Sequence, residues 1–370
     1  MRRRFAIFIV LIQSILFLAH WVVYETVAGF LVRADPPAIS PLAVAFALAS
    51  VSFVTASVLA FRYSHWAVRV FYTICATWLG ILSLCFFASG ACWILYALSR
   101  LLGMHWDGRA LAAILLSSAV AASLYGIINA ARIRVNRITL TLPNLPDSWI
   151  GRTAALVSDT HLGHVRGYGF IRRILKVLTA LKPDVVFIGG DLYDGTAADI
   201  DRLAEPWSRF SAPLGAFFVC GNHEEFSDSR KYIRAVEQRG IRVLNNEKVS
   251  VDGLQIVGVH HRDSAHAERF KSILQAAGLD RDRASILLTH APYHLAAVEQ
   301  EGISLQLSGH THGGQFFPFT WITSRIYGKF VYGLNRLTTL MVYTSSGAGT
   351  WGPPLRVGTR PEIVLFQFER

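Results

Sequence analysis

Five short apolar runs in the second half of the chain end in side chains that can bind metal ions. Each run favours a β-strand because apolar, often β-branched or aromatic residues follow one another without a break. The residues behind the runs are carboxylates, amides and imidazoles, which suit Mn, Fe or Zn. They are Asp159 and His161 after residues 153–157, Asp191 after 185–188, Asn222 and His223 after 214–219, His290 after 285–288, and His310 and His312 after 305–307.

The order of these residues predicts that they meet at one site. In open α/β sheets, ligands bind at the carboxyl ends of the strands, which is where each of these residues stands. Asp159 and His161 are two positions apart, as are His310 and His312, and an extended chain would project each pair to one side. A lone histidine at a strand end is more often a surface or core residue, but five such exits in a row favour a site for two metal ions. Two ions about 3.5–4 Å apart can clamp a transferring phosphoryl group.

The same stretches resemble the calcineurin-like metallophosphoesterase superfamily. The motifs Asp-x-His, Gly-Gly-Asp, Gly-Asn-His-Glu, a lone His and Gly-His-x-His follow one another over about residues 150–320. With the apolar first third of the chain, the sequence is similar to the bacterial membrane-anchored branch of that superfamily. The resemblance implies an α/β fold, a four-layer sandwich of two β-sheets flanked by helices, preceded by an all-α transmembrane four-helix region. It also implies a metal-dependent phosphoric ester hydrolase, either a phosphodiesterase or a pyrophosphatase.

The resemblance further implies a role for each motif residue. One divalent ion would be held by Asp159, His161, Asp191 and His312, and the other by Asp191, Asn222, His290 and His310, with Asp191 bridging the two.

His223 is similar to the catalytic histidine of the family, which stabilises or protonates the leaving oxygen; the alternative is that it orients a ligand. Asn222 and Arg356 are candidates for substrate binding. Relatives often have an arginine where this chain has Ser346, so Arg356 would have to replace it as a phosphate contact.

Composition divides the chain near residue 131. The 370 residues are 52% hydrophobic and 16% charged, with a mean hydropathy of +0.37, which excludes an ordinary soluble protein. Residues 1–130 hold eight basic and three acidic residues, whereas 131–370 hold 28 and 22. Apolar segments at about 5–32, 41–61, 70–99 and 110–131 each reach the roughly 20 residues that span a bilayer. We therefore expect a transmembrane region over 1–131 and a phosphoesterase domain over 138–370.

The arginines predict the orientation in the membrane. Eight flank the spans on one side and three on the other, so the positive-inside rule places the catalytic domain in the cytoplasm of a multi-pass protein of the bacterial inner membrane. The larger set is Arg2, Arg3, Arg4, Arg62, Arg69, Arg132, Arg134 and Arg137; the smaller is Arg33, Arg100 and Arg109. The net charge of +11 suits anionic lipid better than nucleic acid, because no basic cluster is interleaved with aromatics.

Two polar residues interrupt the first span. Glu25 stands either at the far membrane interface or inside the helix bundle, and His20 lies one turn before it. An acid within a membrane is a functional candidate, so a membrane sensor or transport bundle with a phosphoesterase output, acting on a soluble phosphoester, is the alternative to a simple anchor. A metal-binding scaffold without turnover is a third reading.

An aromatic run follows the last metal-ligand motif, from Phe316 to Tyr332. It forms either a packed cap or an exposed rim at the membrane interface, with Arg325, Lys329 and Arg336 on lipid headgroups. The second reading favours a lipid-linked phosphodiester or pyrophosphate as substrate, and a lipid A precursor such as UDP-2,3-diacylglucosamine is the most concrete example. The sequence leaves the oligomeric state open. Surface or rim positions are expected for His164, His260, His261, His266 and His294, and buried apolar positions for the four cysteines.

Overall fold

The computed structural model describes residues 2–32 and 40–370. The chain forms two compact units, one of Met1–Asn129 with Gly352–Val357 and one of Ala130–Trp351 with Gly358–Arg370.

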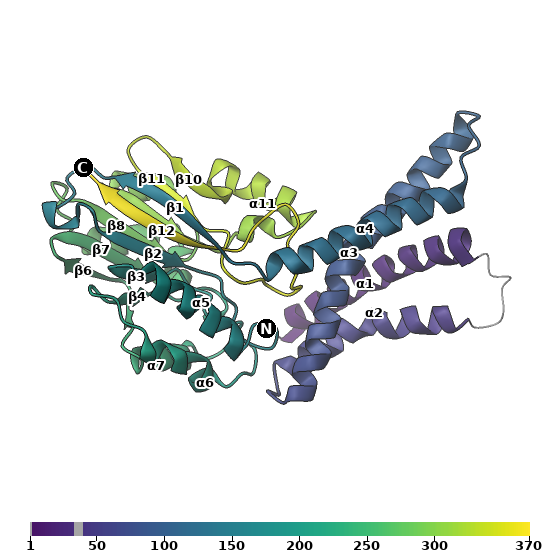
Figure 1. Ribbon diagram of the computed structural model, residues 1–370, viewed down its shortest axis with the longest axis horizontal. Helices are drawn as coiled ribbons and strands as arrows, with labels where there is room; N and C mark the ends of the chain where they lie inside the picture. The colour runs from purple at the N-terminus through teal and green to yellow at the C-terminus, as the bar shows by residue number, and fades with distance from the viewer. Residues whose placement is uncertain (1, 33–39) are drawn as a thin grey trace. The chain divides into compact units, whose positions relative to one another are not determined.

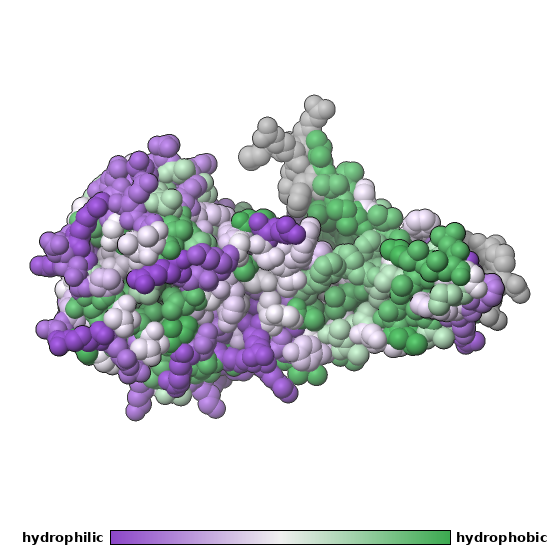
Figure 2. Space-filling model, turned by 90° about the horizontal axis from the view of Figure 1, so that it is seen from above, coloured by the Kyte–Doolittle hydropathy of each residue, from purple (hydrophilic) through white to green (hydrophobic). Residues whose placement is uncertain are grey.

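The first unit is helical. Its four helices are long and apolar enough to cross a membrane, in agreement with the four predicted spans, and Figure 2 shows hydrophobic residues gathered over them. They are α1 (Arg2–Thr26, continued as a π-helix over Val27–Val32), α2 (Pro41–Ala60), α3 (Trp66–Leu101) and α4 (Gly108–Ala130). Arg33, one of the three arginines predicted on the second side of the membrane, lies outside the described residues.

The polar residues of the first span have ordinary partners. His20 is buried; its Nδ1–H donates to the carbonyl of Leu16 (2.8 Å), and its Nε2 accepts from the indole of Trp78 (2.9 Å). Glu25 is exposed and accepts a hydrogen bond from Trp21 (3.1 Å). Glu25 therefore does not face the interior of this unit, and both ring nitrogens of His20 serve helix packing.

The second unit contains two six-stranded sheets (Figure 1). The first has the order β1 (Arg134–Thr141), β12 (Glu362–Glu369), β2 (Thr153–Val157), β3 (Val185–Ile188), β4 (Ala216–Phe218) and β5 (Arg242–Val243). The second has the order β10 (Gly333–Arg336), β11 (Met341–Thr344), β9 (Leu305–Ser308), β8 (Ser285–Thr289), β7 (Leu254–Val259) and β6 (Glu247–Val251). β2, β3 and β4 run parallel, as do β7, β8 and β9.

Successive side chains along these strands face opposite sides of each sheet, and the packing on both sides gives four layers. Leu156 and Phe187 of the first sheet share a buried cluster with Leu288 and Leu307 of the second, so the two sheets pack face to face. The opposite face of the first sheet packs on α5 (Tyr168–Leu181) and α7 (Ser229–Glu237). The opposite face of the second packs on α9 (Ala267–Ala276) and α10 (Leu295–Gln300). The predicted sandwich of two sheets flanked by helices is confirmed.

Both faces of the central strands are buried, which explains why they read as unbroken apolar runs. The predicted strands at 153–157 and 185–188 coincide with β2 and β3. The remaining helices are short: α6 (Ile200–Ala204), α8 (His261–Ser264) and α11 (Phe319–Tyr327). The sequence did not predict them, nor the edge strands β5 and β10. All four cysteines are buried and free, as expected.

Candidate metal centre

Three groups of metal-binding side chains lie where the strands of the two sheets end. Within each group the candidate ligand atoms are no more than 4.8 Å apart. The groups are Asp159, His161 and His312; Asp191, His290 and His310; and His161, Asp194 and His223. β2, β3 and β4 supply the ligands from one sheet and β8 and β9 those from the other, so the fold brings the predicted residues together.

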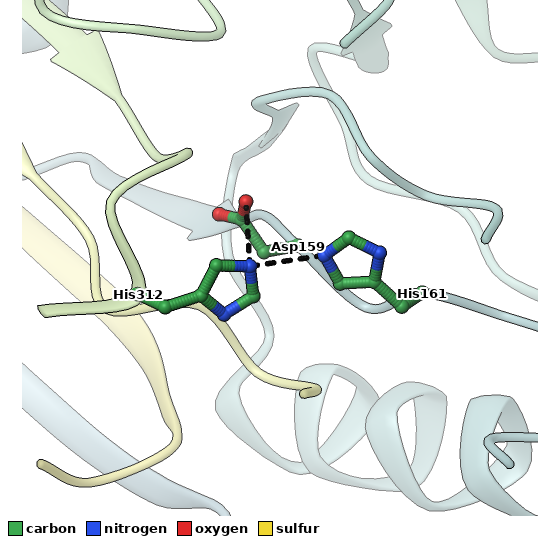
Figure 3. Close-up of side chains that lie close together, drawn as sticks. All are labelled: Asp159, His161 and His312. Carbon is green, nitrogen blue, oxygen red and sulfur yellow. Dashed lines mark hydrogen bonds and ion pairs between the residues drawn. The ribbon is translucent and has the colours of Figure 1, made fainter. Parts of the chain in front are cut away.

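The first group joins the ends of β2 and β9 (Figure 3). His161 Nε2 lies 3.0 Å from His312 Nε2, and His312 Nε2 lies 3.5 Å from Asp159 Oδ1. Asp159 also accepts the backbone N–H of His310 with both oxygens (2.9 and 3.1 Å). The three side chains are almost fully buried, so they form a compact donor set that a small cation fits.

The second group converges on one nitrogen of His290. Its Nδ1–H donates to the carbonyl of Gly189 (2.8 Å), which leaves the Nε2 lone pair free in the neutral ring. That Nε2 faces Asp191 Oδ2 at 3.2 Å, Asn222 Oδ1 at 3.1 Å and His310 Nδ1 at 3.1 Å. One proton could satisfy only one of these contacts, whereas a cation between the four groups satisfies all of them. The donor chemistry of this group therefore fits a divalent metal ion.

The pKa values of the buried His290 and Asp191 also favour positive charge at this centre. Burial opposes charge on His290, yet Asp191 raises the pKa of that imidazole to about 10. Burial alone would raise the pKa of Asp191, but His290 and His223 hold it well below its usual range. Burial lowers the pKa of His310 to about 3. A proton on Nε2 of His290 thus supplies positive charge beside Asp191, and a bound cation would take the place of that proton.

The backbone at the ligands is not extended, contrary to the prediction from their i, i+2 spacing. Five predicted ligand residues have a positive φ: Asp159 (51°), His161 (48°), Asp191 (49°), His310 (71°) and His312 (52°). Such conformations cost about 1–3 kcal/mol each for residues other than glycine and cluster at functional sites. The side chains converge because the chain turns sharply after each strand. Gly221 and Gly309 permit this, since a Cβ at either would overlap the carboxylates of Asp191 and Asp159, respectively.

Asp194 belongs to the centre although the sequence did not single it out. Its carboxylate Oδ1 lies 3.6 Å from His161 Nδ1 and 3.8 Å from His223 Nδ1, and its carbonyl accepts the Nδ1–H of His223 (2.9 Å). The Nε2 of His223 then points towards Asp191 Oδ2 at 3.9 Å. Burial lowers the pKa of His223 despite the nearby acids. Asp194 therefore orients one predicted ligand and the predicted catalytic histidine.

Glu224 fixes the two turns that present Asp191 and Asn222. Its buried carboxylate accepts three backbone N–H groups: Asp191 (3.0 Å), Tyr193 (2.9 Å) and Gly221 (2.7 Å). Burial and the charge of Asp191 raise the pKa of Glu224 to about 7. Glu224 holds the loops after β3 and β4 to each other without contributing an atom to a donor group.

Two other residues named in the sequence analysis, Arg356 and His164, are buried. Arg356 is buried; its N–H donates to Gly126 (3.0 Å) and its carbonyl accepts from Asn129 (2.9 Å), within the first unit, so its contact with substrate stays a prediction. His164, expected at the surface or rim, is instead buried against Thr196 (3.1 Å).

His261 occupies a rim position beside the second donor group. Its ring centroid lies 5.4 Å from that of His290 and 5.6 Å from that of His310, and Tyr293 adds a hydroxyl 3.5 Å from His310 Nε2. Burial and the neighbouring His290 lower the pKa of His261 to about 4. A neutral imidazole and a phenol therefore line this side of the centre.

Comparison with known proteins gives a consistent result. The family described as calcineurin-like phosphoesterase matches residues 153–314. A transmembrane protein with a metallophosphoesterase domain from Danio rerio is 33% identical over 263 residues, covering 65% of this chain and 59% of that protein. An uncharacterized metallophosphoesterase from Campylobacter jejuni is 32% identical, covering 66% of each chain. Another from Aquifex aeolicus is 31% identical, covering 67% of this chain and 96% of that protein.

The match does not extend over the whole of every relative. The chain spans 59% and 66% of the length of the first two relatives.

Proposed function

This chain belongs to the calcineurin-like metallophosphoesterase family, and from that premise we propose that it hydrolyses a lipid-linked phosphodiester or pyrophosphate with two divalent ions bound at Asp191. The observation that carries the proposal is the position of Asp191. Its Oδ2 lies 3.2 Å from His290 Nε2 in one donor group and 3.8 Å from His161 Nε2 in the other. One carboxylate thus stands between two sets of ligands.

We assign the ligands as the sequence motifs suggest. Asp159, His161, Asp191 and His312 would hold one ion, and Asp191, Asn222, His290 and His310 the other. Imidazole and oxygen donors without a thiolate suit Mn, Fe or Zn. When bound, such ions supply the Lewis acidity that activates water and neutralises the charge of a transferring phosphoryl group.

His223 would donate a proton to the leaving oxygen. Because its Nδ1–H is committed to the carbonyl of Asp194 (2.9 Å), Nε2 is the atom that can face the substrate. Burial favours the neutral ring, but an anionic phosphoryl group beside it favours the imidazolium. The Nε2–H of that imidazolium can then be donated to the leaving oxygen, a step that typically contributes about 10²–10⁴-fold in rate.

Two features support a lipid-linked substrate. The described residues include four candidate membrane helices, and the segment after the predicted ligand His312 exposes large apolar side chains such as Phe317 and Trp321. A water-soluble phosphoester requires neither feature. UDP-2,3-diacylglucosamine, a lipid A precursor, is the most concrete substrate of this class. From the arginine distribution we propose that the reaction takes place on the cytoplasmic side of the bacterial inner membrane.

Turnover by the purified full chain in detergent tests the proposal. Bis-p-nitrophenyl phosphate and UDP-2,3-diacylglucosamine are compared with and without Mn²⁺, and an Asp191→Asn variant serves as the control for contaminating activity. We expect Mn²⁺-dependent cleavage of both compounds, with the lipid nucleotide cleaved much faster. Cleavage of the small diester alone would refute this lipid A precursor as the substrate and favour the sensor or transport alternative. Cleavage of neither compound, in the presence of bound metal, would refute hydrolysis of this class.

A further inference from the structure

Helix α11 (Phe319–Tyr327) has an outer face that nothing in the described part of its unit covers. None of its nine residues is buried. Trp321 is 57% exposed and Ile326 is 67% exposed, which are high values for side chains of this size. The exposed apolar residues on and beside this helix form what we call the α11 surface: Phe317, Phe319, Trp321, Ile322, Ile326 and Tyr332. The packed-cap reading of the aromatic run therefore does not hold for this helix.

The α11 surface is held firmly at both ends. Before the helix, Phe316 is buried and its carbonyl accepts the N–H of Thr320 (3.2 Å). At the other end, the Tyr327 ring stacks on Tyr293 with centroids 6.4 Å apart and lies 6.4 Å from the His310 ring. The helix therefore has a fixed position beside the candidate metal centre, and its apolar side chains face outwards.

The charged residues within the segment that carries this surface are all basic, although the hydroxyl of Tyr332 donates to Glu362 outside it (3.0 Å). Residues 315–340 contain Arg325, Lys329 and Arg336 and no acidic residue. The Arg325 guanidinium lies over the Trp321 ring, 5.5 Å from its centroid, and the Lys329 ammonium lies 5.1 Å from the centroid of Phe330. Apolar and aromatic side chains with basic groups beside them are the composition of helices that lie in the interface of an anionic bilayer.

The first strand of this unit is tied closely along the chain to α4, a helix long and apolar enough to cross a membrane. The membrane-length helix α4 ends at Ala130 and β1 begins at Arg134, so the connection spans at most about 15 Å. We propose that the α11 surface lies in the headgroup region of the bilayer that holds the four helices, with Trp321 and Ile326 inserted among the lipids and Arg325 and Lys329 on anionic headgroups. The proposal goes beyond the hydrolytic function, because contact with lipid does not depend on turnover.

A depth measurement on the full chain tests the contact. Ile326→Cys is spin-labelled and the protein is placed in nanodiscs of phosphatidylcholine, alone or mixed with phosphatidylglycerol; the four native cysteines are buried. Glu237→Cys, at an exposed position of α7, is the matched control. We expect the label at 326 to be accessible to oxygen and protected from an aqueous nickel complex, more strongly with phosphatidylglycerol, and the label at 237 to show the reverse. Equal access of the nickel complex to both labels in both mixtures would overturn the proposal.

One further variant, assayed on two substrates, separates this contact from the proposed reaction. Trp321→Ala should lower turnover of UDP-2,3-diacylglucosamine at least tenfold and leave that of bis-p-nitrophenyl phosphate within twofold, because Trp321 contacts lipid and no donor group. Equal losses on both substrates would contradict a role in lipid access. Protection of the label at 326 in a protein that cleaves neither compound would keep the membrane contact and refute only the proposed function.

Discussion

Substituting Glu224 by glutamine should weaken metal binding although Glu224 is not a predicted ligand. Its carboxylate accepts the N–H groups of Asp191, Tyr193 and Gly221 at 2.7–3.0 Å. Asp191, with a φ of 49°, is held in a conformation that costs about 1–3 kcal/mol. The three bonds stabilise that conformation, so their loss lets the bridging candidate relax.

The size of the effect follows from counting acceptors. Oε2 of Glu224 accepts from Asp191 and Gly221, and Oε1 accepts from Tyr193. Glutamine has one acceptor oxygen and one NH₂ donor, so in either orientation at least one buried N–H faces another donor. An unpaired buried donor costs roughly 1–3 kcal/mol, which is below the roughly 5–15 kcal/mol that stabilises a typical domain. The variant should therefore fold but present Asp191 less accurately.

Isothermal titration of the purified full chain with Mn²⁺ measures the outcome. At pH 8 the carboxyl is ionised, because the pKa of Glu224 is raised only to about 7, and we expect Glu224→Gln to bind Mn²⁺ about 10–100-fold more weakly than wild type. The difference should narrow as the pH falls below 7, since a protonated carboxyl, like an amide, has one free acceptor and one donor. Glu237→Gln, at an exposed position of α7, should bind as wild type does. Unchanged affinity of Glu224→Gln at pH 8 would refute the reasoning.

Three further predictions concern Asp194, His223 and Glu299. Asp194→Asn removes the carboxylate near His161 Nδ1 (3.6 Å) and should weaken Mn²⁺ binding about tenfold in equilibrium dialysis; full affinity would contradict an orienting role. His223→Asn should lower kcat by about 10²–10⁴ with metal content unchanged, and loss of metal instead would identify His223 as a residue that positions ligands. Backbone N–H groups of the 338–340 turn lower the pKa of Glu299 from 4.5 to about 2. The folded-state pKa of Glu299 lies below its unfolded-state value, so the ionised carboxyl stabilises the folded protein at pH values above 4.5. Glu299→Gln should therefore lower the unfolding temperature at pH 7, and the difference from wild type should shrink as the pH falls from 4.5 and be small at pH 2. An undiminished difference at pH 2 would refute this account.

The central strands could be predicted because a strand that is buried on both faces is apolar at every position. β2 and β3 are unbroken apolar runs, and their ends coincide with the predicted ones. β5 has only two residues, one of them the exposed Arg242, so neither alternation nor an apolar run marks it. Helix α11 is apolar for a different reason, since its side chains face outwards, and composition alone does not distinguish an outward apolar face from a buried one.

Asp194 could not be recognised from strand ends, because its position depends on the pairing of two loops. Its N–H donates to the carbonyl of Leu162 (2.9 Å), and the bridge between Leu162 and Tyr193 aligns the loop after β3 with the loop after β2. The only trace in the sequence is the spacing of Asp191 and Asp194, three residues apart. This spacing indicates a shared site only when the contact with the loop after β2 is known.

The predicted ligands converge because the chain turns sharply at them, and not because it is extended, as the spacing predicted. An extended chain would have directed Asp159 and His161 to one side at no conformational cost. The chain instead places both residues at a positive φ, which is stable only because surrounding bonds enforce it. The N–H of Asp159 donates to Gly190 and that of His161 to Asp191 (both 3.0 Å), so each strained turn is tied to the neighbouring loop. The predicted ligands are therefore positioned by cross-loop backbone bonds of the protein itself, and variants that remove those bonds should alter metal affinity more than they alter the fold.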